Sequence, residues 1–268
     1  MDGQPSVVAV ITAGWSPKEG DPLVEHTRGR PKALIPIAGK PMISHVVDAV
    51  AGSRYVQHVV IVALEPSVKA QFPVPVDYVP DAGDILSNAE SGLRYALDRY
   101  PDLDAIMLSS SDVPTVTPPI VDAFVEECFQ TDHDLYYTVV ERSVMEARFP
   151  GSRRSYVHLR EGDFAGGDIM LIRPSLDVTR RDLWEELAQA RKNALRQARI
   201  IGLWTFFKLA TRRLSLAETQ RRVCKALNIR GRVIPFPHAE IGMDVDKPSQ
   251  LEIVRAEMEG RVATPASG

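Results

Sequence analysis

Residues 7–41 read VVAVITAGWSPKEGDPLVEHTRGRPKALIPIAGKP, and this stretch determines the predicted fold. Its first six residues are β-branched or alanine, which is typical of a buried strand that ends at Ala13–Gly14. A long loop that contains Gly20, Gly29 and Gly39 follows. Because glycines let backbone N–H groups approach an anion closely, this arrangement predicts an α/β domain with an anion-binding first loop.

Strand-like and helix-like segments alternate along the rest of the chain. This alternation predicts a three-layer α/β/α sandwich with a mixed, mainly parallel sheet of Rossmann-like type. We expect strands at residues 7–12, 58–63, 76–79, 105–109, 135–140, 156–159, 169–172 and 231–235. We expect helices at residues 41–51, 85–100, 118–129 and 249–259, with two or three more between 182 and 227.

The length of 268 residues is ordinary for one α/β domain with an insertion. We expect a single domain over residues 1–260, a helical insertion at about 178–230, and a flexible tail over 261–268. Parallel strands carry their ligand-binding loops at their carboxyl ends. The loops after Thr12 and Ser109 are therefore expected at one shared edge of the sheet.

The composition indicates which classes of binding partner and which cellular compartment to expect. The net charge of −3 is unlike that of a basic nucleic-acid binder, so no nucleic acid is expected as a partner. Cys128 and Cys224 stand far apart and suggest reduced thiols in a cytoplasmic protein. No segment has the roughly 20 apolar residues that span a bilayer.

Two parts of the sequence suggest phosphate chemistry. The first loop carries Lys18, Arg28, Arg30 and Lys32, and cations beside glycine amides suit a triphosphate. Asp112 follows the strand at 105–109 in the segment SSSDVP, where its carboxylate could help to hold Mg²⁺. The alternatives are a solvated surface loop and an aspartate that caps a turn or helix.

The segments ITAG and PKALIPIAGKP resemble the start of the nucleotidyltransferases with a glycosyltransferase-A-like fold. This group includes molybdenum-cofactor cytidylyltransferases (the MobA-like NTP transferases), sugar-1-phosphate nucleotidylyltransferases and methylerythritol-phosphate cytidylyltransferases. Trp15–Ser16 stands where the family has x-G, and the signature arginine that follows in the family is absent. Lys18, Arg28 and Arg30 remain open as its replacement.

The resemblance implies an enzyme of the nucleotide-diphospho-sugar transferase type. It would move a nucleoside monophosphate from an NTP, with CTP or GTP favoured, to a small phosphorylated or acidic acceptor and release pyrophosphate. Mg²⁺, or Mn²⁺ in its place, is the implied cofactor. Lys32 and Asp112 would be catalytic, and Thr12, Ala13 and Gly14 would line the nucleotide site.

The resemblance also implies the second metal ligand and the two substrate pockets. Asp246, in EIGMDVDKPSQ, falls on the family's second metal-binding position, and Asp244 falls on a nearby active-site position. For Asp246 the structural alternative is an N-cap of the closing helix. The segment resembling the nucleobase contact contains Gly83, Ser87 and Asn88, and the one resembling the acceptor pocket contains Gly166, Gly167 and Asp168. Purely structural alternatives are a capped helix, with Asp84 as the cap, and a hairpin turn before a strand.

Residues 191–213 carry seven Lys or Arg and no Asp or Glu, around an aromatic segment with Trp204, Phe206 and Phe207. Three interpretations remain open: a helix packed on the core, peripheral contact with an anionic membrane surface, and a lid over an acidic acceptor.

Two rival functions are also considered. A nucleotide-sugar-dependent glycosyltransferase would need a D-x-D motif, but Pro114 stands where its second aspartate is expected. A non-catalytic, membrane-associated module of the same fold is the other rival.

Overall fold

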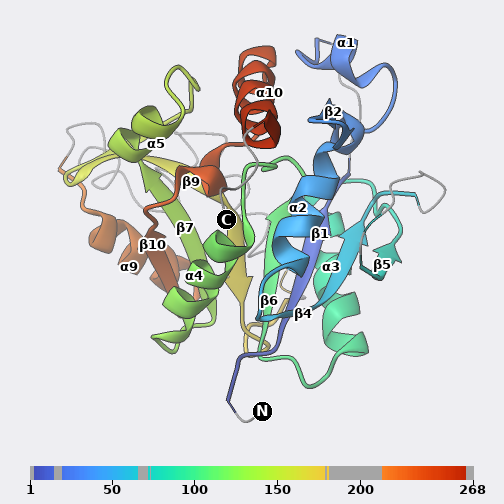
Figure 1. The fold of residues 1–268 in the computed structure, drawn as a ribbon. Coiled ribbons are helices and arrows are strands. Elements are labelled where there is room, and N and C mark those ends of the chain that lie inside the picture. Colours follow the sequence, from blue (N-terminus) through green and yellow to red (C-terminus); the bar gives the residue numbers. More distant parts are fainter. Residues whose placement is uncertain are drawn as a thin grey trace.

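The structure of the chain is a computed structural model (Figure 1). It describes residues 3–14, 20–65, 72, 74–178, 180 and 213–263, with the side chains of 261–263 excepted. Lys18 and residues 181–212, more than half of the predicted insertion, lie outside the described residues. None of the described helices combines the length and apolar composition that crossing a bilayer requires.

An eight-stranded sheet forms the centre of the molecule, in the order β10-β7-β9-β6-β1-β4-β5, with β8 paired to β9. Its strands are β1 (Val7–Thr12), β4 (Val56–Val62), β5 (Val76–Val79), β6 (Ala105–Ser110), β7 (Leu135–Glu141), β8 (Val157–Leu159), β9 (Gly162–Ile172) and β10 (Gly231–Pro235). β1 pairs in parallel with both β4 and β6, whereas β9 runs antiparallel between β6 and β7. The prediction of a mixed, mainly parallel sheet is confirmed.

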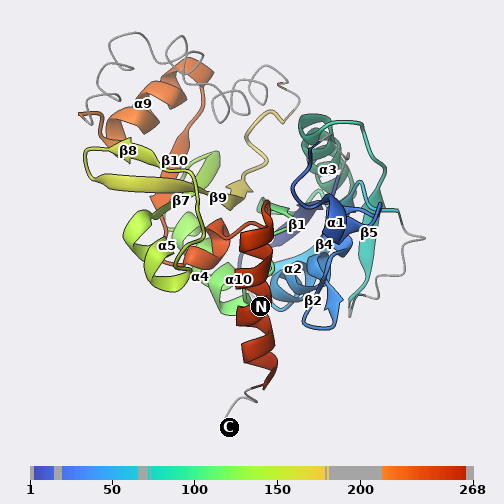
Figure 2. The same cartoon turned by 90° about the horizontal axis from the view of Figure 1, so that it is seen from above.

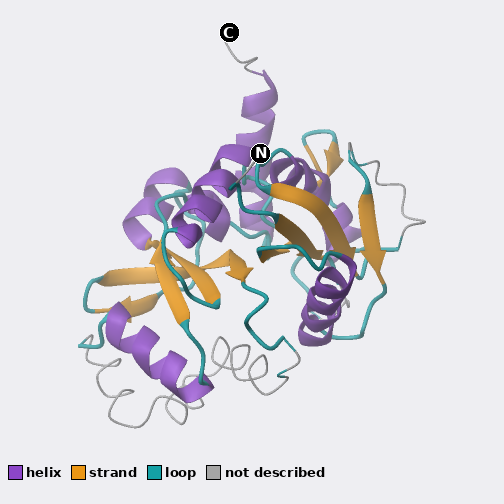
Figure 3. Cartoon of the chain, turned by 90° about the horizontal axis from the view of Figure 1, so that it is seen from below, coloured by secondary structure: helices purple, strands orange, loops and turns teal. Residues whose placement is uncertain are grey.

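Helices cover both faces of this sheet. They are α1 (Val24–Thr27), α2 (Met42–Ala51), α3 (Ile85–Arg99), α4 (Pro118–Phe129), α5 (Arg142–Arg148), α9 (Leu216–Leu227) and α10 (Pro248–Ala263), with the short turns η1 (Lys32–Leu34) and η2 (Ala239–Gly242). In the views from above and from below, α3 and α9 lie on one side of the sheet, and α2, α4 and α10 lie on the other (Figures 2 and 3). The three-layer prediction is therefore confirmed.

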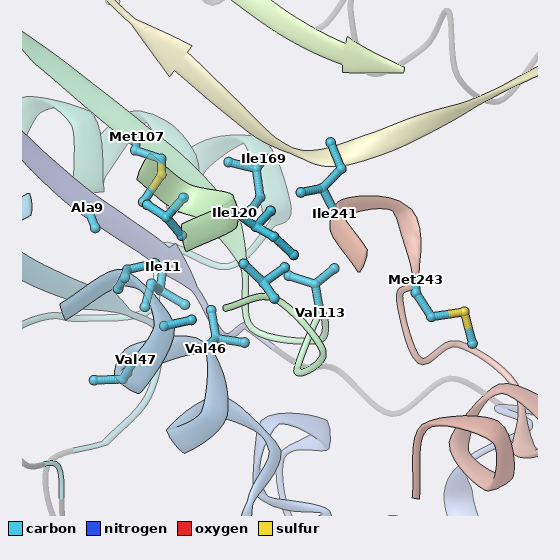
Figure 4. Close-up of a cluster of buried hydrophobic side chains, with 14 of the residues drawn as sticks. Ala9, Ile11, Val46, Val47, Met107, Val113, Ile120, Ile169, Ile241 and Met243 are labelled. Atoms are coloured by element: carbon cyan, nitrogen blue, oxygen red, sulfur yellow. The ribbon is translucent and has the colours of Figure 1, made fainter. Parts of the chain in front are cut away.

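The alternation of residues along β1 explains the two layers of core. Val7, Ala9 and Ile11 belong to the core under α2, α4 and α10, whereas Val8 and Val10 belong to the core under α3 and α9. Successive side chains of a strand point to opposite faces, so a strand that is buried on both sides reads as a continuous apolar run. Part of the first core is drawn in Figure 4.

Most predicted elements match the observed bounds within two residues, but the first loop and the glycine pair differ. The first loop contains α1, η1 and the small hairpin β2 (Pro36–Ile37) and β3 (Lys40–Pro41). Gly166 and Gly167 were expected just before a strand, and that prediction was wrong because both lie inside β9. The hairpin alternative for this pair is wrong for the same reason. In the region predicted to hold two or three helices, the described part contains α9.

Gly92 lets α3 lie unusually close to the sheet. A Cβ added at Gly92 would be 2.6 Å from both Val10 Cγ1 and Val62 Cγ2. Carbon atoms pack at about 3.5–4.0 Å, so even one methyl group would push the helix outward. Gly92 therefore fixes the distance between α3 and β1, and with it the position of the first turn of α3 beside the end of β1.

We predict that Gly92→Ala destabilises the protein, although alanine is the better helix former. The gain in helix propensity is about 1 kcal/mol, whereas overpacking costs about 1–3 kcal/mol, so the free energy of unfolding should fall. Gly260→Ala in α10 is the matched control, because nothing lies within 4 Å of a Cβ added there. Urea unfolding measures both, and equal stabilities for the two variants would contradict the packing argument.

Candidate active site

The central strands β1 and β6 end side by side at one edge of the sheet. The backbone N–H of Ser111 donates to the carbonyl of Thr12 at 3.1 Å, and the N–H of Ala13 donates to Val62 at 2.9 Å. These bonds hold Thr12, Ala13 and Gly14 at the carboxyl edge, where ligands bind in open α/β sheets. In Figure 1, α1, the β2 hairpin and α10 lie at this same end of the molecule.

Asp112 lies two residues beyond β6 and is anchored on both sides. Ser110 Oγ donates a hydrogen bond to its carboxylate, and the next residue, Val113, is fully buried in the core. The carbonyl of Asp112 accepts a hydrogen bond from the N–H of Val245 at 3.0 Å. This last bond attaches the segment at residues 243–246 to the end of β6.

The sequence MDVD at residues 243–246 presents alternate side chains to the core and to the site. Met243 and Val245 are fully buried, whereas the carboxylates of Asp244 and Asp246 lie against Arg154 and Lys32. The side-chain oxygen of Gln250, in the first turn of α10, accepts from the backbone N–H of Asp246 at 2.9 Å. Gln250 also donates to Ser152 at 3.2 Å, so α10 fixes the backbone of Asp246.

Lys32 joins the two aspartates. Its Nζ lies 2.6 Å from Asp112 Oδ2 and 2.7 Å from Asp246 Oδ1. The side chains of Lys32 and Asp112 are mostly buried, at 19% and 14% exposed, whereas that of Asp246 is 57% exposed. The structure thus brings together three predicted site residues from opposite ends of the chain, and the carboxylate of Asp246 contacts Lys32.

The charges of these residues stabilise one another. Burial by itself lowers the pKa of a lysine, but Asp112 and Asp246 outweigh it and hold the pKa of Lys32 above its ordinary value. Partial desolvation would raise the pKa of Asp246, yet Lys32, Arg154 and Lys247 together hold that pKa below its ordinary value. At neutral pH the ammonium and the Asp246 carboxylate are therefore both charged.

Arg154 is a site residue that the sequence prediction missed. Its guanidinium pairs closely with Asp244 and lies 3.5 Å from Asp168, and it donates to the carbonyl of Gly166 at 3.2 Å. All three side chains in these ion pairs are about 10% exposed. Arg154 stands in the loop GSRRS, which has no periodicity or motif that could have singled it out.

A bulge in β9 explains the position of Asp168. Between the pairs Tyr137–Met170 and Val139–Gly166, β7 has one residue whereas β9 has three. The single residue, Thr138, donates from Oγ1 to the carbonyl of Ile169 at 2.8 Å. Bulges re-aim side chains and are common beside active sites. Here the bulge carries Asp168 to Arg154.

Gly167 is required by this bulge. A Cβ added there would lie 2.1 Å from Thr138 Oγ1, which is too close for any side chain. The glycine pair therefore has a structural cause: Gly167 permits the close backbone approach, and Gly166 provides the carbonyl for Arg154. Contact of Gly166, Gly167 and Asp168 with an acceptor stays a prediction.

The predicted base-binding residues form a compact turn beside the end of β1. Asn88 is buried, its Oδ1 accepts from the N–H of Ala82 at 2.7 Å, and its Nδ2 donates to Asp81 at 2.9 Å. A Cβ on Gly14 would lie 2.6 Å from Asn88 Nδ2, so only glycine fits at position 14. The backbone N–H of Gly83 and the amide of Asn88 lower the pKa of Asp81.

Asp84 caps α3, as the structural alternative for this segment predicted. It accepts from the N–H groups of Leu86 and Ser87, and Ser87 Oγ donates to it at 2.6 Å. Ser87 therefore already has a partner inside the protein. Contact of Gly83, Ser87 and Asn88 with a nucleobase stays a prediction.

Arg28 and Arg30 are exposed on the loop that leads to Lys32. Arg28 follows α1 in the left-handed conformation, with φ of 50°. Within the described residues neither side chain makes an ion pair, so both cations remain available to an anion. Lys18, the third candidate for the place of the family's signature arginine, lies outside the described residues.

The donor set suits magnesium. In the part of the chain that the structure describes, no three His, Cys, Asp or Glu side chains come together as a metal-binding group. Mg²⁺ uses one or two protein carboxylates together with water and substrate phosphates. Asp112 and Asp246 supply two such carboxylates around one cation, the ammonium of Lys32.

Comparison with known families matches the chain to a group of proteins. Residues 21–205, more than half of the chain, match the family model of the MobA-like NTP transferase domain. The chain belongs to this family. The predicted family resemblance is thereby confirmed.

The curated relatives that the chain matches include cytidylyltransferases and a probable guanylyltransferase. The 2-C-methyl-D-erythritol 4-phosphate cytidylyltransferase of Streptomyces avermitilis is 32% identical over 133 residues, 47% of this chain and 52% of that protein. A probable molybdenum cofactor guanylyltransferase of Pyrococcus horikoshii is 29% identical over 121 residues, 45% of this chain and 55% of that protein. The chain thus spans about half the length of these relatives.

Solved structures of similar fold extend over nearly the whole chain. A hypothetical transferase from Thermus thermophilus has 31% identity and a TM-score of 0.77, over 93% of this chain and 100% of that one. A CMP:2-keto-3-deoxy-manno-octonic acid synthetase in complex with CTP has 18% identity and a TM-score of 0.54, over 96% and 99%. The second likeness is one of fold.

We predict that Arg154→Met destabilises the protein by about 3–5 kcal/mol, because it removes the cation that neutralises two buried carboxylate charges. Adding Asp244→Asn to Arg154→Met should restore part of this loss, since it removes one of those charges. Arg160→Met is the control: its side chain is 69% exposed, and it should change stability by less than about 0.5 kcal/mol. Chemical denaturation measures all three, and a double variant no more stable than Arg154→Met would count against the charge explanation.

Proposed function

We propose that this protein transfers a nucleoside monophosphate from an NTP to a small phosphorylated or acidic acceptor, with release of pyrophosphate and with Mg²⁺ as cofactor. One observation carries the proposal: Lys32, Asp112 and Asp246 meet at the carboxyl edge of the sheet, next to the end of β1. Membership of the MobA-like NTP transferase family supports it.

The residues at this edge have distinct roles in the proposed reaction. The turn at Thr12–Gly14 and the cations of the first loop would bind the triphosphate, and Lys32 would neutralise charge on the phosphates. Asp112 and Asp246 would hold Mg²⁺, or Mn²⁺ in its place, which neutralises phosphate charge when it is bound. An acceptor oxygen would attack the α-phosphorus, and pyrophosphate would leave from the opposite side.

The nucleotide is proposed to be CTP or GTP. The matched relatives are named as cytidylyltransferases and a guanylyltransferase. Asn88 and the turn at Ala82–Gly83 lie beside the end of β1, where the base of a bound nucleotide would be read. Because the amide of Asn88 and the N–H groups of Ala82 and Gly83 are already bonded within this turn, the backbone carbonyls of the turn are proposed as partners for the base.

The acceptor side is proposed to lie at the β9 bulge, near Asp168 and the Gly166–Gly167 pair. Arg154 connects this bulge to Asp244 and so to the segment that carries Asp246. Residues 191–212 lie outside the described residues, so a peripheral contact of residues 191–213 with a membrane surface stays a prediction. The cytoplasmic location also stays a prediction.

Replacing either aspartate should abolish most turnover. Asp112→Asn and Asp246→Asn each remove one negative charge from the proposed Mg²⁺ site, so we expect pyrophosphate release to fall by at least about a hundredfold. Asp102→Asn is the matched control, since Asp102 is exposed near the opposite, amino end of β6. Circular dichroism should show an intact fold in all three, and near-normal turnover in Asp112→Asn would refute the assigned role.

A screen of nucleotides should identify the donor. A ligand that binds the folded state raises the melting temperature by mass action, so CTP or GTP with Mg²⁺ should stabilise the protein more than ATP or UTP. The nucleotide found in this way is then tested for pyrophosphate release with candidate acceptors. If none of the four shifts the melting temperature, with or without Mg²⁺, the proposed donor site does not exist.

A further inference from the structure

The position of Lys32 raises a question about how the proposed metal site is filled. One ammonium group lies within 2.7 Å of a carboxylate oxygen from Asp112 and of another from Asp246. These two side chains are the ones proposed to hold Mg²⁺. A lysine that is proposed to act on phosphates is therefore engaged with the residues that the metal needs.

We propose that Lys32 is a built-in substitute for the metal, so that its ammonium and a divalent cation compete for Asp112 and Asp246. This inference rests on the proposed function, because it takes the two aspartates as the metal ligands. Metal binding would move Lys32 off the carboxylates and make its ammonium available to the phosphates of the nucleotide.

The backbones of the two aspartates are held in place independently of Lys32. The hydrogen bond from Val245 N to the carbonyl of Asp112 joins their two segments, and Gln250 fixes the backbone of Asp246. Without a cation between them, two such carboxylates would repel each other. The ammonium removes this repulsion, which allows the site to exist before the metal arrives.

The surroundings also permit the exchange. Asp246 is 57% exposed, so the site is open to solvent on that side. Lysine carries its charge on a flexible four-carbon chain, and Lys32 is the first residue of the short turn η1. Nucleotide phosphates that bind the released ammonium would keep it away from the two carboxylates. Nucleotide binding would therefore raise the affinity of the site for the metal.

The test measures Mn²⁺ binding to the protein alone, without nucleotide or acceptor, by the electron paramagnetic resonance signal of free Mn²⁺. Lys32→Met removes the competing charge and keeps the chain length, so we expect Mn²⁺ to bind about tenfold more tightly than to the unmodified protein. Adding Asp112→Asn to Lys32→Met should abolish this gain, because it removes a ligand charge.

Lys247→Met is the matched control. Lys247 neighbours Asp246 in sequence, but its Nζ donates to the carbonyl of Arg153 at 3.1 Å. Removing an exposed charge that is not in contact should change Mn²⁺ affinity less than about threefold. Equal effects of Lys32→Met and Lys247→Met, or no tightening in Lys32→Met, would overturn the proposal.

A second variant and a second readout cover the case in which Lys32→Met does not fold. Lys32→Gln also lacks the charge and keeps a polar end. For either variant, Mn²⁺ should raise the melting temperature more than it does for the unmodified protein, since the metal replaces the missing cation. Absence of pyrophosphate release with every NTP would count against the proposed function, whereas this binding experiment contains no NTP and tests the exchange by itself.

Discussion

One backbone hydrogen bond, from the N–H of Val245 to the carbonyl of Asp112, determines the geometry of the site. It joins a segment near the end of the chain to the end of a central strand, 133 positions earlier. On either side of it, Val113, Met243 and Val245 are buried in the same core. Apolar burial thus fixes two backbones, and the carboxylates that alternate with the buried residues are left facing the edge of the sheet.

Two cations make this concentration of carboxylates tolerable. Lys32 lies between Asp112 and Asp246, and Arg154 lies between Asp244 and Asp168. Removing water from a charged group is costly, and only close pairing offsets that cost. The two cations have different tasks: Arg154 is nearly buried and links structural segments, whereas Lys32 contacts an exposed partner and stands where a metal and a nucleotide are proposed to bind.

The elements that could be predicted from the sequence are those that depend on patterns within a few neighbouring residues. The apolar run at 7–12, the helix cap at Asp84 and the proline before α2 are signals within a few residues, and the elements built on them were correct. The meeting of Asp112 with Asp246 depends on tertiary contacts, so only the family resemblance suggested it. The role of Arg154 was missed because its partners Asp168 and Asp244 lie 14 and 90 positions away in the sequence. The bulge at Gly167 was missed because it depends on the pairing of β9 with β7.

The antiparallel direction of β9 explains why the acceptor is proposed to approach from that side. β9 pairs Ile169 with Ser109 and Ile172 with Ile106, so the residues before 169 continue past the carboxyl end of β6. A parallel strand would bring its own last residues to this edge, whereas β9 brings a segment from its middle. That segment contains the bulge, and it places Asp168 next to Arg154 close to the loop that carries Asp112. The reversal of one strand therefore gives the edge a second side, across from the turn after β1 that is proposed to bind the nucleotide.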